Sequence, residues 1–362
     1  MHRTNRAPRP PGHGRRRFVA AVPVMLVAIL ALAAGCGDDD RPAPAGSLYE
    51  LDPPELGLES VTSAGPGVPV LCYHYFRSGF DPGYLARVLG SVLFGMPALG
   101  PREFWTTPIG EFEKHLKHFR DTGTRVMTLD EVADLVETGR PLPPRAVVLT
   151  IDDADRSVYE LAWPLLREYG VRAHLFVPTG HVGSDWADLD VCSWEELREM
   201  AASGTIILGS HTRDLHYKIG TRKGLEPVFW NPQEIDGERR AATLADVTAH
   251  RRQGDLAWPP AATAVLSGPW GPVAADLLAS RGDIATARTD ARWLAWPYGF
   301  ANGDLDSIAR AVGFRGTVSL EPRPFAATDS LLHTGRFTLT AKSTVGMLDE
   351  IMRRSAELSP TP

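Results

Sequence analysis

The chain has 362 residues, and 38 Lys and Arg against 44 Asp and Glu give it a formal net charge of -6. A hydrophobic fraction of 43% and a charged fraction of 23% are typical of a globular protein and argue against a fibrous or mostly disordered one. Three cysteines are too few for a disulfide scaffold or for a zinc module built on four cysteines.

The charge is unevenly distributed along the chain. Residues 1–35 carry six arginines and no acidic residue, which leaves 32 basic against 44 acidic side chains, a net charge of -12, in the rest. Because a nucleic-acid binder needs a clustered cationic surface, this acidity excludes nucleic acid as an expected partner.

Residues 1–35 have the pattern of a signal peptide. A basic stretch ending at Arg17 precedes 17 uncharged residues, 18–34, a length typical of a secretory signal and short for a membrane span. The segment ends at Ala33-Ala34-Gly35-Cys36, which resembles a bacterial lipobox and implies a diacylglycerol on Cys36. We therefore expect an exported bacterial lipoprotein, at the cell membrane or outer membrane, facing the periplasm or the cell exterior. A transmembrane anchor stays open as the alternative, as does export by the general or the twin-arginine route.

Pro, Gly and acidic residues dominate the stretch that follows the signal. We expect residues 36–67 to form an acylated cysteine and a flexible linker, followed by one monomeric domain over 68–362. Within this domain Cys72 and Cys192 could pair in an oxidising compartment or remain two buried thiols.

Strands and helices alternate from Val68 onward, which predicts an α/β fold with a largely parallel sheet. The expected strands are 68–73, 125–127, 146–151, 173–177, 205–208, 293–296 and 316–320. The expected helices are 107–120, a helix from 128 that stops before 139, 158–169, one from 193, and 273–287, 305–312 and 345–358. About seven such units in one domain indicate a distorted (β/α) barrel of about seven parallel strands.

Three local patterns add detail to this outline. Thr128 with Glu131, and Ser193 with Glu196, form capping boxes that predict where two helices begin. Residues 217–270 show scattered Trp and Pro without periodicity, and we expect a long, irregular insertion that forms a surface excursion or lid. The helix over 107–120 carries two histidines, His115 and His118, which we expect on its solvated face.

Polar residues follow the carboxyl ends of the predicted strands, where such folds gather their reactive groups. Asp152 and Asp153 end an apolar strand, and an exposed turn is the alternative explanation for them. His211 and His216 follow the second strand after it. A separation of five residues turns about 140° on a helix, so the two imidazoles could converge only from a turn. Imidazoles and one carboxylate are a familiar ligand set for a divalent metal with open positions.

Three motifs in this order resemble the polysaccharide deacetylase family (carbohydrate esterase family 4, the NodB homology domain) over about residues 68–340. They are Thr150-Ile151-Asp152-Asp153, Ser210-His211-Thr212 with His216, and Trp296-Pro297-Tyr298-Gly299. The resemblance implies a NodB-like fold and a metal-dependent N-deacetylase. By motif position, Asp153, His211 and His216 would hold zinc, with cobalt, nickel or iron as alternatives. Asp152 would be the general base, and the Tyr298 backbone N–H would donate to the oxyanion.

The chain departs from the usual family motifs at three places. The five-residue histidine spacing, with Asp214 inside it, looks like the subgroup that acts on poly-β-1,6-N-acetylglucosamine. Ala295 stands where the family has an arginine, so another cation, Arg336, would have to steady the base. His333 matches the motif that supplies a general acid, but its surroundings look like a subgroup without that histidine. The sequence therefore leaves His333 as either the acid or an exposed loop residue.

Three further residues are candidates for contact with substrate. His74 ends the first strand facing the expected site, and it could contact substrate or be a buried core histidine. Trp296 could stack on a sugar ring or pack in the core, and Pro297 lies beside it.

These patterns predict an N-deacetylase acting on N-acetylglucosamine units of an extracellular polysaccharide, with poly-β-1,6-N-acetylglucosamine as the expected polymer. The alternatives are a peptidoglycan, chitin or xylan deacetylase and a non-catalytic carbohydrate-binding lipoprotein on the same fold. A glycoside hydrolase is disfavoured, because it needs two carboxylates on opposite sides of the scissile bond, and Asp152 and Asp153 are adjacent.

Overall fold

The computed structural model describes residues 66–79, 104–187 and 189–357. The predicted signal peptide, Cys36 and the linker as far as residue 65 lie outside this part of the chain. Within the described part, no helix is both long and apolar enough to cross a membrane.

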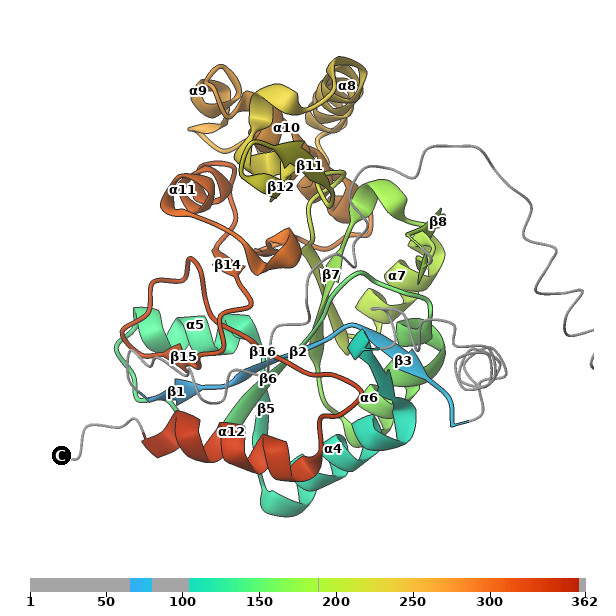
Figure 1. Cartoon of the computed structure of the whole chain (residues 1–362), viewed down its shortest axis with the longest axis vertical. Coiled ribbons are helices and arrows are strands. Elements are labelled where there is room, and N and C mark those ends of the chain that lie inside the picture. Colours follow the sequence, from blue (N-terminus) through green and yellow to red (C-terminus); the bar gives the residue numbers. More distant parts are fainter. Residues whose placement is uncertain (1–65, 80–103, 188, 358–362) are drawn as a thin grey trace, which may run out of the picture. The chain divides into compact units, whose positions relative to one another are not determined.

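A parallel sheet of eight strands forms the centre of the fold (Figure 1). Its strands are β2 (Val70–Tyr73), β5 (Arg125–Met127), β6 (Ala146–Ile151), β7 (Ala173–Val177), β10 (Ile206–Ser210), β13 (Trp293–Ala295), β14 (Gly316–Val318) and β16 (Phe337–Thr338). Seven of them follow the order β14-β13-β10-β7-β6-β2-β16, and β5 also pairs with β6. The predicted α/β class, with about seven parallel strands curled into a partial barrel, is confirmed.

Short strand pairs border this sheet. They are β1 (Gly67–Val68) with β15 (Phe325–Ala326), β3 (Tyr75–Arg77) with β4 (Thr106–Pro108), β8 (Asp185–Trp186) with β9 (Leu189–Asp190), and β11 (Lys218–Thr221) with β12 (Gly224–Pro227). The strand predicted over 68–73 is divided between β1 and β2. Pro69 lies at the division, and its missing N–H interrupts the pairing there.

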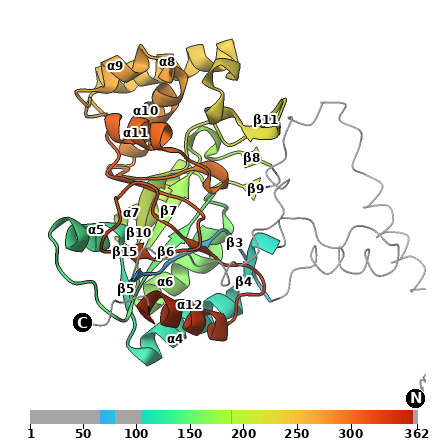
Figure 2. The ribbon, with the colours of Figure 1, turned by 60° about the vertical axis from the view of Figure 1, so that its left-hand side comes forward.

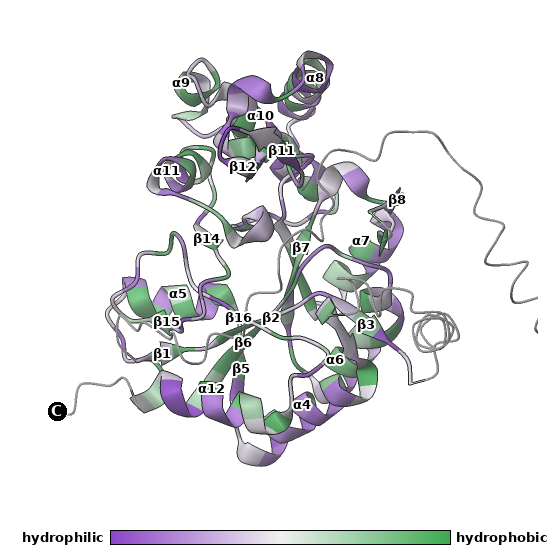
Figure 3. Cartoon of the chain, viewed as in Figure 1, coloured by the Kyte–Doolittle hydropathy of each residue, from purple (hydrophilic) through white to green (hydrophobic). Residues whose placement is uncertain are grey.

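Helices surround the sheet, and hydrophobic residues are concentrated along the central strands (Figures 2 and 3). The α-helices are α4 (Ile109–Thr122), α5 (Leu129–Glu137), α6 (Trp163–Tyr169), α7 (Trp194–Ala202), α8 (Gly237–Gln253), α9 (Ala262–Leu266), α10 (Gly271–Ala285), α11 (Gly303–Ala311) and α12 (Val345–Glu357). One π-helical turn, η1 (Val158–Ala162), and four 3-10 turns, η2 (Thr179–His181), η3 (Val228–Trp230), η4 (Pro232–Glu234) and η5 (Pro297–Gly299), complete the fold. Helices α8 to α11 gather at the opposite end of the described domain from α4 and α12 (Figures 1 and 2).

The starts of three helices test the predicted boundaries. Thr128 and Ser193 each form a complete capping box with the glutamate three residues later, as predicted. The helix predicted from residue 107 begins instead at Ile109. Pro108 precedes it in an extended conformation, because residues 106–108 pair with β3 as a strand.

The prediction that His115 lies on a solvated helix face is wrong. His115 is fully buried, with its Nδ1 3.1 Å from the Tyr73 hydroxyl and its Nε2 3.0 Å from the Ser343 carbonyl oxygen. The Ser343 partner comes from the segment before α12, more than 200 residues away, so local periodicity carried no sign of this contact. His118 is only partly buried and pairs with Asp349.

Residues 217–270 are ordered, which corrects the prediction of irregular structure. They form the β11–β12 hairpin and two helices, of which α8 packs against α10. Helix α8 begins at the side-chain cap Asp236 and ends at Gly254 in a left-handed conformation. Only Thr243 and Val247 of α8 are buried, so the helix lacks the apolar stripe by which an amphipathic helix is recognised.

The sheet register brings the ends of distant strands together. Tyr73 is paired with Ile151, and Ser210 is paired with both Val177 and Leu294. The residues that follow these strands therefore leave the sheet at one edge, where polar side chains can meet.

Candidate active site

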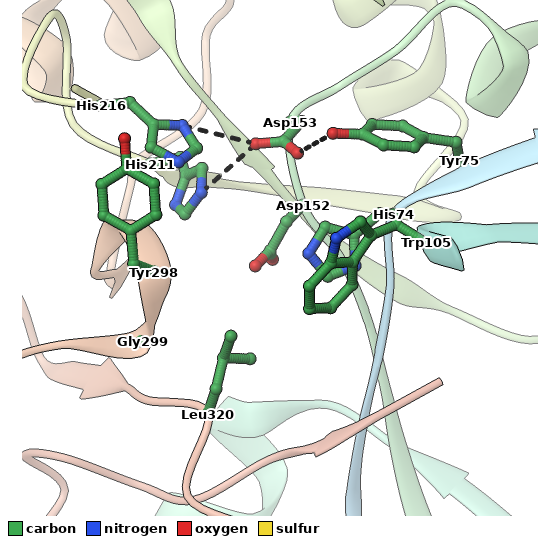
Figure 4. Close-up of a pocket in the computed structure, with 10 residues that line it drawn as sticks. All are labelled: His74, Tyr75, Trp105, Asp152, Asp153, His211, His216, Tyr298, Gly299 and Leu320. Atoms are coloured by element: carbon green, nitrogen blue, oxygen red, sulfur yellow. Dashed lines mark hydrogen bonds and ion pairs between the residues drawn. The ribbon is translucent and has the colours of Figure 1, made fainter. Parts of the chain in front are cut away.

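An open cavity of about 460 Å³ lies at the carboxyl ends of the strands (Figure 4). It is lined by His74, Tyr75, Trp105, Asp152, Asp153, His211, His216, Tyr298, Gly299 and Leu320. Both aspartates, the three histidines and Tyr298 belong to the residues predicted from the sequence. The structure therefore brings together residues from six segments of the chain, around a volume suited to a small ligand or one unit of a polymer.

Asp153, His211 and His216 form a buried cluster on one side of the cavity (Figure 4). Asp153 Oδ1 lies 3.4 Å from His211 Nε2 and 3.6 Å from His216 Nδ1. The other carboxylate oxygen, Oδ2, accepts a 2.6 Å hydrogen bond from the Tyr75 hydroxyl. Tyr75 therefore orients the carboxylate so that Oδ1 faces the two imidazoles.

This cluster fits a divalent metal ion. Two donors about 2.1 Å from a tetrahedral zinc are roughly 3.4 Å apart, close to the separations from Asp153 to the two imidazoles. Asp153 Oδ1 and His216 Nδ1 are buried and have no hydrogen-bond partner among the described residues. Because a buried polar atom without a partner costs free energy, their convergence indicates a site built for a cation.

A backbone contact selects the ring nitrogen that His211 offers to this cluster. His211 Nδ1 lies 2.8 Å from the carbonyl oxygen of Ala295, at the end of β13. A carbonyl can only accept, so Nδ1 carries the proton and donates it. In the neutral form of the ring the lone pair is therefore on Nε2, which lies on the side of Asp153, as a metal ligand requires.

Asp152 is held by Arg336 through two hydrogen bonds. Arg336 Nη1 donates to Oδ1 at 2.7 Å and Nη2 donates to Oδ2 at 2.8 Å, and Arg336 is fully buried. Its Nε donates to the carbonyl oxygen of Ser319. The sequence predicts another cation beside Asp152, because Ala295 carries no charge. Arg336 supplies that cation.

Electrostatics keep both aspartates ionised. Burial alone would raise the pKa of Asp152, but the Arg336 guanidinium holds it below its usual range. Burial would likewise raise the pKa of Asp153, and the nearby His211 and His216 hold it well below the usual range. Burial lowers the pKa of His216 far below its usual value, so this imidazole is neutral and available as a ligand.

Tyr298 lies in the η5 turn on the opposite wall of the cavity from Trp105 (Figure 4). Its backbone has φ of 62°, and the N–H groups of the next two residues bond to the carbonyl oxygens of Trp296 and Pro297. The ring of Tyr298 stacks edge-on against His216, with 4.7 Å between centroids. The turn therefore holds the Tyr298 backbone rigidly beside the metal-ligand cluster.

Three predicted site residues do not line the cavity. Trp296 is fully buried, and its Nε1 donates to Asp306, so it packs in the core instead of facing a sugar ring. Pro297 is also buried and does not line the cavity. His333 is 28% exposed and pairs with Asp306 and Glu321, so the structure does not place it as the acid.

Sequence reasoning missed four residues that line the cavity. Tyr75 lies two residues after the end of β2, and Leu320 lies two residues after the end of β14. The rule that functional residues follow the strand ends could therefore have found them. Gly299 follows Tyr298 in the same turn. Trp105 stacks on His74 with 4.6 Å between centroids and comes from the segment before β4, where no sequence signal marked it.

Cys72, His74 and Asp152 form a second group of potential ligands. Both oxygens of Asp152 are already bonded to the cationic Arg336, which disfavours a metal ion there. Cys72 and Cys192 are free, buried thiols. The sequence alternative of two unpaired thiols is therefore the observed one.

Comparisons with known proteins match this geometry. The family model described as polysaccharide deacetylase matches residues 139–260. The poly-beta-1,6-N-acetyl-D-glucosamine N-deacetylase of Staphylococcus aureus (strain MSSA476) is 36% identical over 107 residues, which are 29% of this chain and 37% of that protein. The protein of the same name from Staphylococcus epidermidis is 34% identical over 120 residues, 33% of this chain and 40% of that protein.

A solved structure extends the similarity to most of the domain. IcaB from Ammonifex degensii superposes with a TM-score of 0.57 and 25% sequence identity, covering 81% of this chain and all but 1% of that one. The chain spans little more than a third of the length of the curated staphylococcal relatives. The family-model match over residues 139–260 holds the Asp152-Asp153 and His211–His216 motifs. The motifs, the curled parallel sheet and the buried ligand cluster agree with this match, by which residues 139–260 resemble the polysaccharide deacetylase family.

Proposed function

We propose that this chain is a metal-dependent N-deacetylase that removes acetyl groups from N-acetylglucosamine units of an extracellular polysaccharide. The observation that carries the proposal is the arrangement in one cavity of a buried Asp-His-His cluster and a separate carboxylate, Asp152, paired with Arg336. The carboxylate of Asp153 is oriented toward the two imidazoles that would share the metal ion. The carboxylate of Asp152 is ionised and lines the cavity. Hydrolysis of an amide needs both elements.

The proposed roles follow from these positions. Asp153, His211 and His216 would hold the ion, which supplies Lewis-acid polarisation of the acetamide carbonyl when bound. Polysaccharide deacetylases generally depend on a divalent metal, and the nitrogen and oxygen donors here favour zinc, with cobalt, nickel and iron as alternatives. Asp152, kept ionised by Arg336, would accept the proton of the attacking water.

Charge development during the reaction would be stabilised by the backbone. The Tyr298 N–H, on the rigid η5 turn, would donate to the oxygen that becomes negative as water adds to the carbonyl carbon. Asp152 would then return its proton to the amine nitrogen as the C–N bond breaks. This assignment replaces His333, which lies outside the cavity.

The preferred substrate is poly-β-1,6-N-acetylglucosamine. The five-residue spacing of His211 and His216 supports this choice, as do the names of the staphylococcal relatives. We also propose that Cys36 is lipidated and that the domain acts outside the cytoplasm as a monomer. The lipobox-like sequence Ala33-Ala34-Gly35-Cys36 supports this location.

The competing interpretation as a non-catalytic carbohydrate-binding protein rested on Ala295, which leaves the usual arginine position empty. Arg336 supplies a cation to Asp152 through two hydrogen bonds. This contact favours an enzyme, because a buried charged pair is costly to keep without a use.

Acetate release from a panel of polymers tests the proposal. The zinc-loaded protein should release acetate from β-1,6-linked N-acetylglucosamine oligomers faster than from chitin oligomers, peptidoglycan or acetylated xylan. Asp152→Asn should lower kcat by about 10²- to 10⁴-fold, since a general base contributes that much, while metal content stays at the wild-type level. The same substitution at Asp190, which is 49% exposed, serves as the matched control.

Two results would overturn the proposal. Full activity of Asp152→Asn would remove the assigned base, and full activity after complete chelation of metal would remove the assigned metal centre. Faster release from chitin, peptidoglycan or xylan would keep the chemistry and change the substrate.

A further inference from the structure

The turn between His211 and His216 is held by hydrogen bonds to several consecutive backbone groups. Asp276 Oδ1 and Oδ2 accept hydrogen bonds from the backbone N–H groups of Arg213 and Asp214, each at 2.8 Å. Asp276 lies on α10, far from the turn in sequence. One carboxylate therefore fixes the two consecutive peptide groups at the centre of the turn.

The neighbouring backbone groups are also bonded. Ser210 Oγ accepts from the N–H of Thr212 and is itself 2.7 Å from the hydroxyl of Ser280, one helical turn after Asp276 on α10. The N–H groups of Thr179 and Gly180 donate to the carbonyl oxygens of Thr212 and Arg213.

The close approach at residue 180 requires glycine. A Cβ at Gly180 would lie 2.7 Å from the carbonyl oxygen of Arg213, which is closer than such atoms approach in proteins. The turn also contains a residue that the hydrogen bonds must hold in place. Thr212 has φ of 68°, a conformation that β-branched residues avoid. A turn with this strain keeps its shape only where its surroundings determine it.

Burial of the Asp276 carboxylate costs folding free energy. Its side chain is 2% exposed, and burial raises its pKa to about 7, although the two N–H donors favour the ionised form. Burying Asp276 lowers the stability of the fold, and its carboxylate bonds the turn between two metal ligands. A role in the site therefore explains this residue better than a role in stability.

We infer that Asp276 and Ser280 are positioning residues, which hold the His211–His216 turn in the geometry that binds metal. The inference rests on the proposed metal centre and assigns to α10 a role in it. Helix α8 also contacts the turn, through ion pairs of Asp246 with Arg213 and of Arg239 with Asp214, and the inference assigns these pairs no role in metal binding.

Metal affinity measured by chelator competition tests the inference. Asp276→Asn should weaken binding of Zn²⁺ and Co²⁺ by about 10- to 100-fold, as loss of an outer-shell partner does, because the amide offers a single acceptor for two N–H groups. Ser280→Ala should weaken binding in the same direction by a smaller factor. The Co²⁺ absorption spectrum of Asp276→Asn should also change, since it reports the arrangement of the ligands.

Asp246→Asn is the matched control. It makes the same chemical change at a residue that contacts the same turn, but through the Arg213 side chain only, and Asp246 is 40% exposed. Its metal affinity and Co²⁺ spectrum should equal those of the wild type. If Asp276→Asn does not fold, as judged by circular dichroism, Ser280→Ala decides.

The outcomes separate this inference from the proposed function. Wild-type affinity and an unchanged Co²⁺ spectrum in both Asp276→Asn and Ser280→Ala would overturn the positioning role. Failure of the wild-type protein to bind any divalent ion would instead overturn the metal centre.

Discussion

At the scale of single residues, Asp152 is held by Arg336, a partner far from it in the chain. Ala295 offers no charge at the position where the family usually has arginine. Arg336 reaches the same carboxylate from the segment before β16, where it is fully buried and bonded to Asp152 through two hydrogen bonds. The geometry of the pair, and not the strand that supplies the arginine, is therefore what the site requires.

Removing Arg336 should destabilise the protein strongly. Arg336→Met would leave Asp152 buried without its cation, and we expect the free energy of unfolding to fall by about 3–5 kcal/mol in denaturant titrations. The double variant Asp152→Asn with Arg336→Met should recover part of this loss, because no buried charge is left unpaired. Arg353→Met, at a 51% exposed ion pair with Glu350, should change stability by less than about 0.5 kcal/mol. Equal losses in the single and double variants would contradict this account.

Tyr298 allows the backbone and the side chain of one residue to be tested separately. Its hydroxyl is buried and has no hydrogen-bond partner among the described residues, so Tyr298→Phe should leave stability unchanged or raise it by up to about 1 kcal/mol. The N–H proposed as the oxyanion donor stays in place, and kcat should remain within about tenfold of wild type. A larger loss of kcat at unchanged stability would show that the hydroxyl itself contacts substrate.

At the scale of secondary-structure elements, helix starts were predicted well where the signal is local. The two capping boxes, at Thr128 and Ser193, form as predicted because each needs only side chains three residues apart. Helix α8 was missed because its partners, on α10 and in the His211–His216 turn, are distant in sequence. Only two residues of α8 are buried, so its sequence shows no periodic hydrophobic pattern.

The caps predict a matched pair of stability changes. Thr128→Ala and Ser193→Ala should each lower the free energy of unfolding by about 1 kcal/mol, measured by denaturant titration, because each removes the acceptor for a backbone N–H of the first helical turn. Deacetylase activity at a temperature well below unfolding should be unchanged in both. Loss of activity in Ser193→Ala alone would indicate a chemical role that its capping geometry does not explain.

At the scale of the whole molecule, buried histidines make stability depend on pH. Burial lowers the pKa of both His115 and His174 to about 4, from about 6.5 in the unfolded chain. Between these values the unfolded state binds more protons, so stability is fully present above pH 6.5 and is lost as pH falls toward 4. Between pH 7 and pH 5 each histidine should cost about 2 kcal/mol of unfolding free energy.

A variant isolates one of these histidines. His115→Gln retains a donor for the Ser343 carbonyl oxygen but does not titrate, so its stability should fall by about 2 kcal/mol less than that of wild type between pH 7 and pH 5. Denaturant titrations at the two pH values provide the measurement. Identical pH dependence in both proteins would show that His115 is not protonated on unfolding in this range.

The sequence by itself determined the α/β class and the succession of strands along the chain. Its motifs, through the family resemblance, indicated the ligands Asp153, His211 and His216, the base Asp152 and a cation beside it. These features depend on short-range patterns: apolar strands, caps and polar residues at strand ends. Only the tertiary structure decided that Trp296 is core, that His333 lies outside the cavity, that Trp105 lines it, and that Asp276 bonds the ligand turn. Each of these outcomes depends on which distant segments pack together, and contacts between segments far apart in the chain leave no periodic trace in either one.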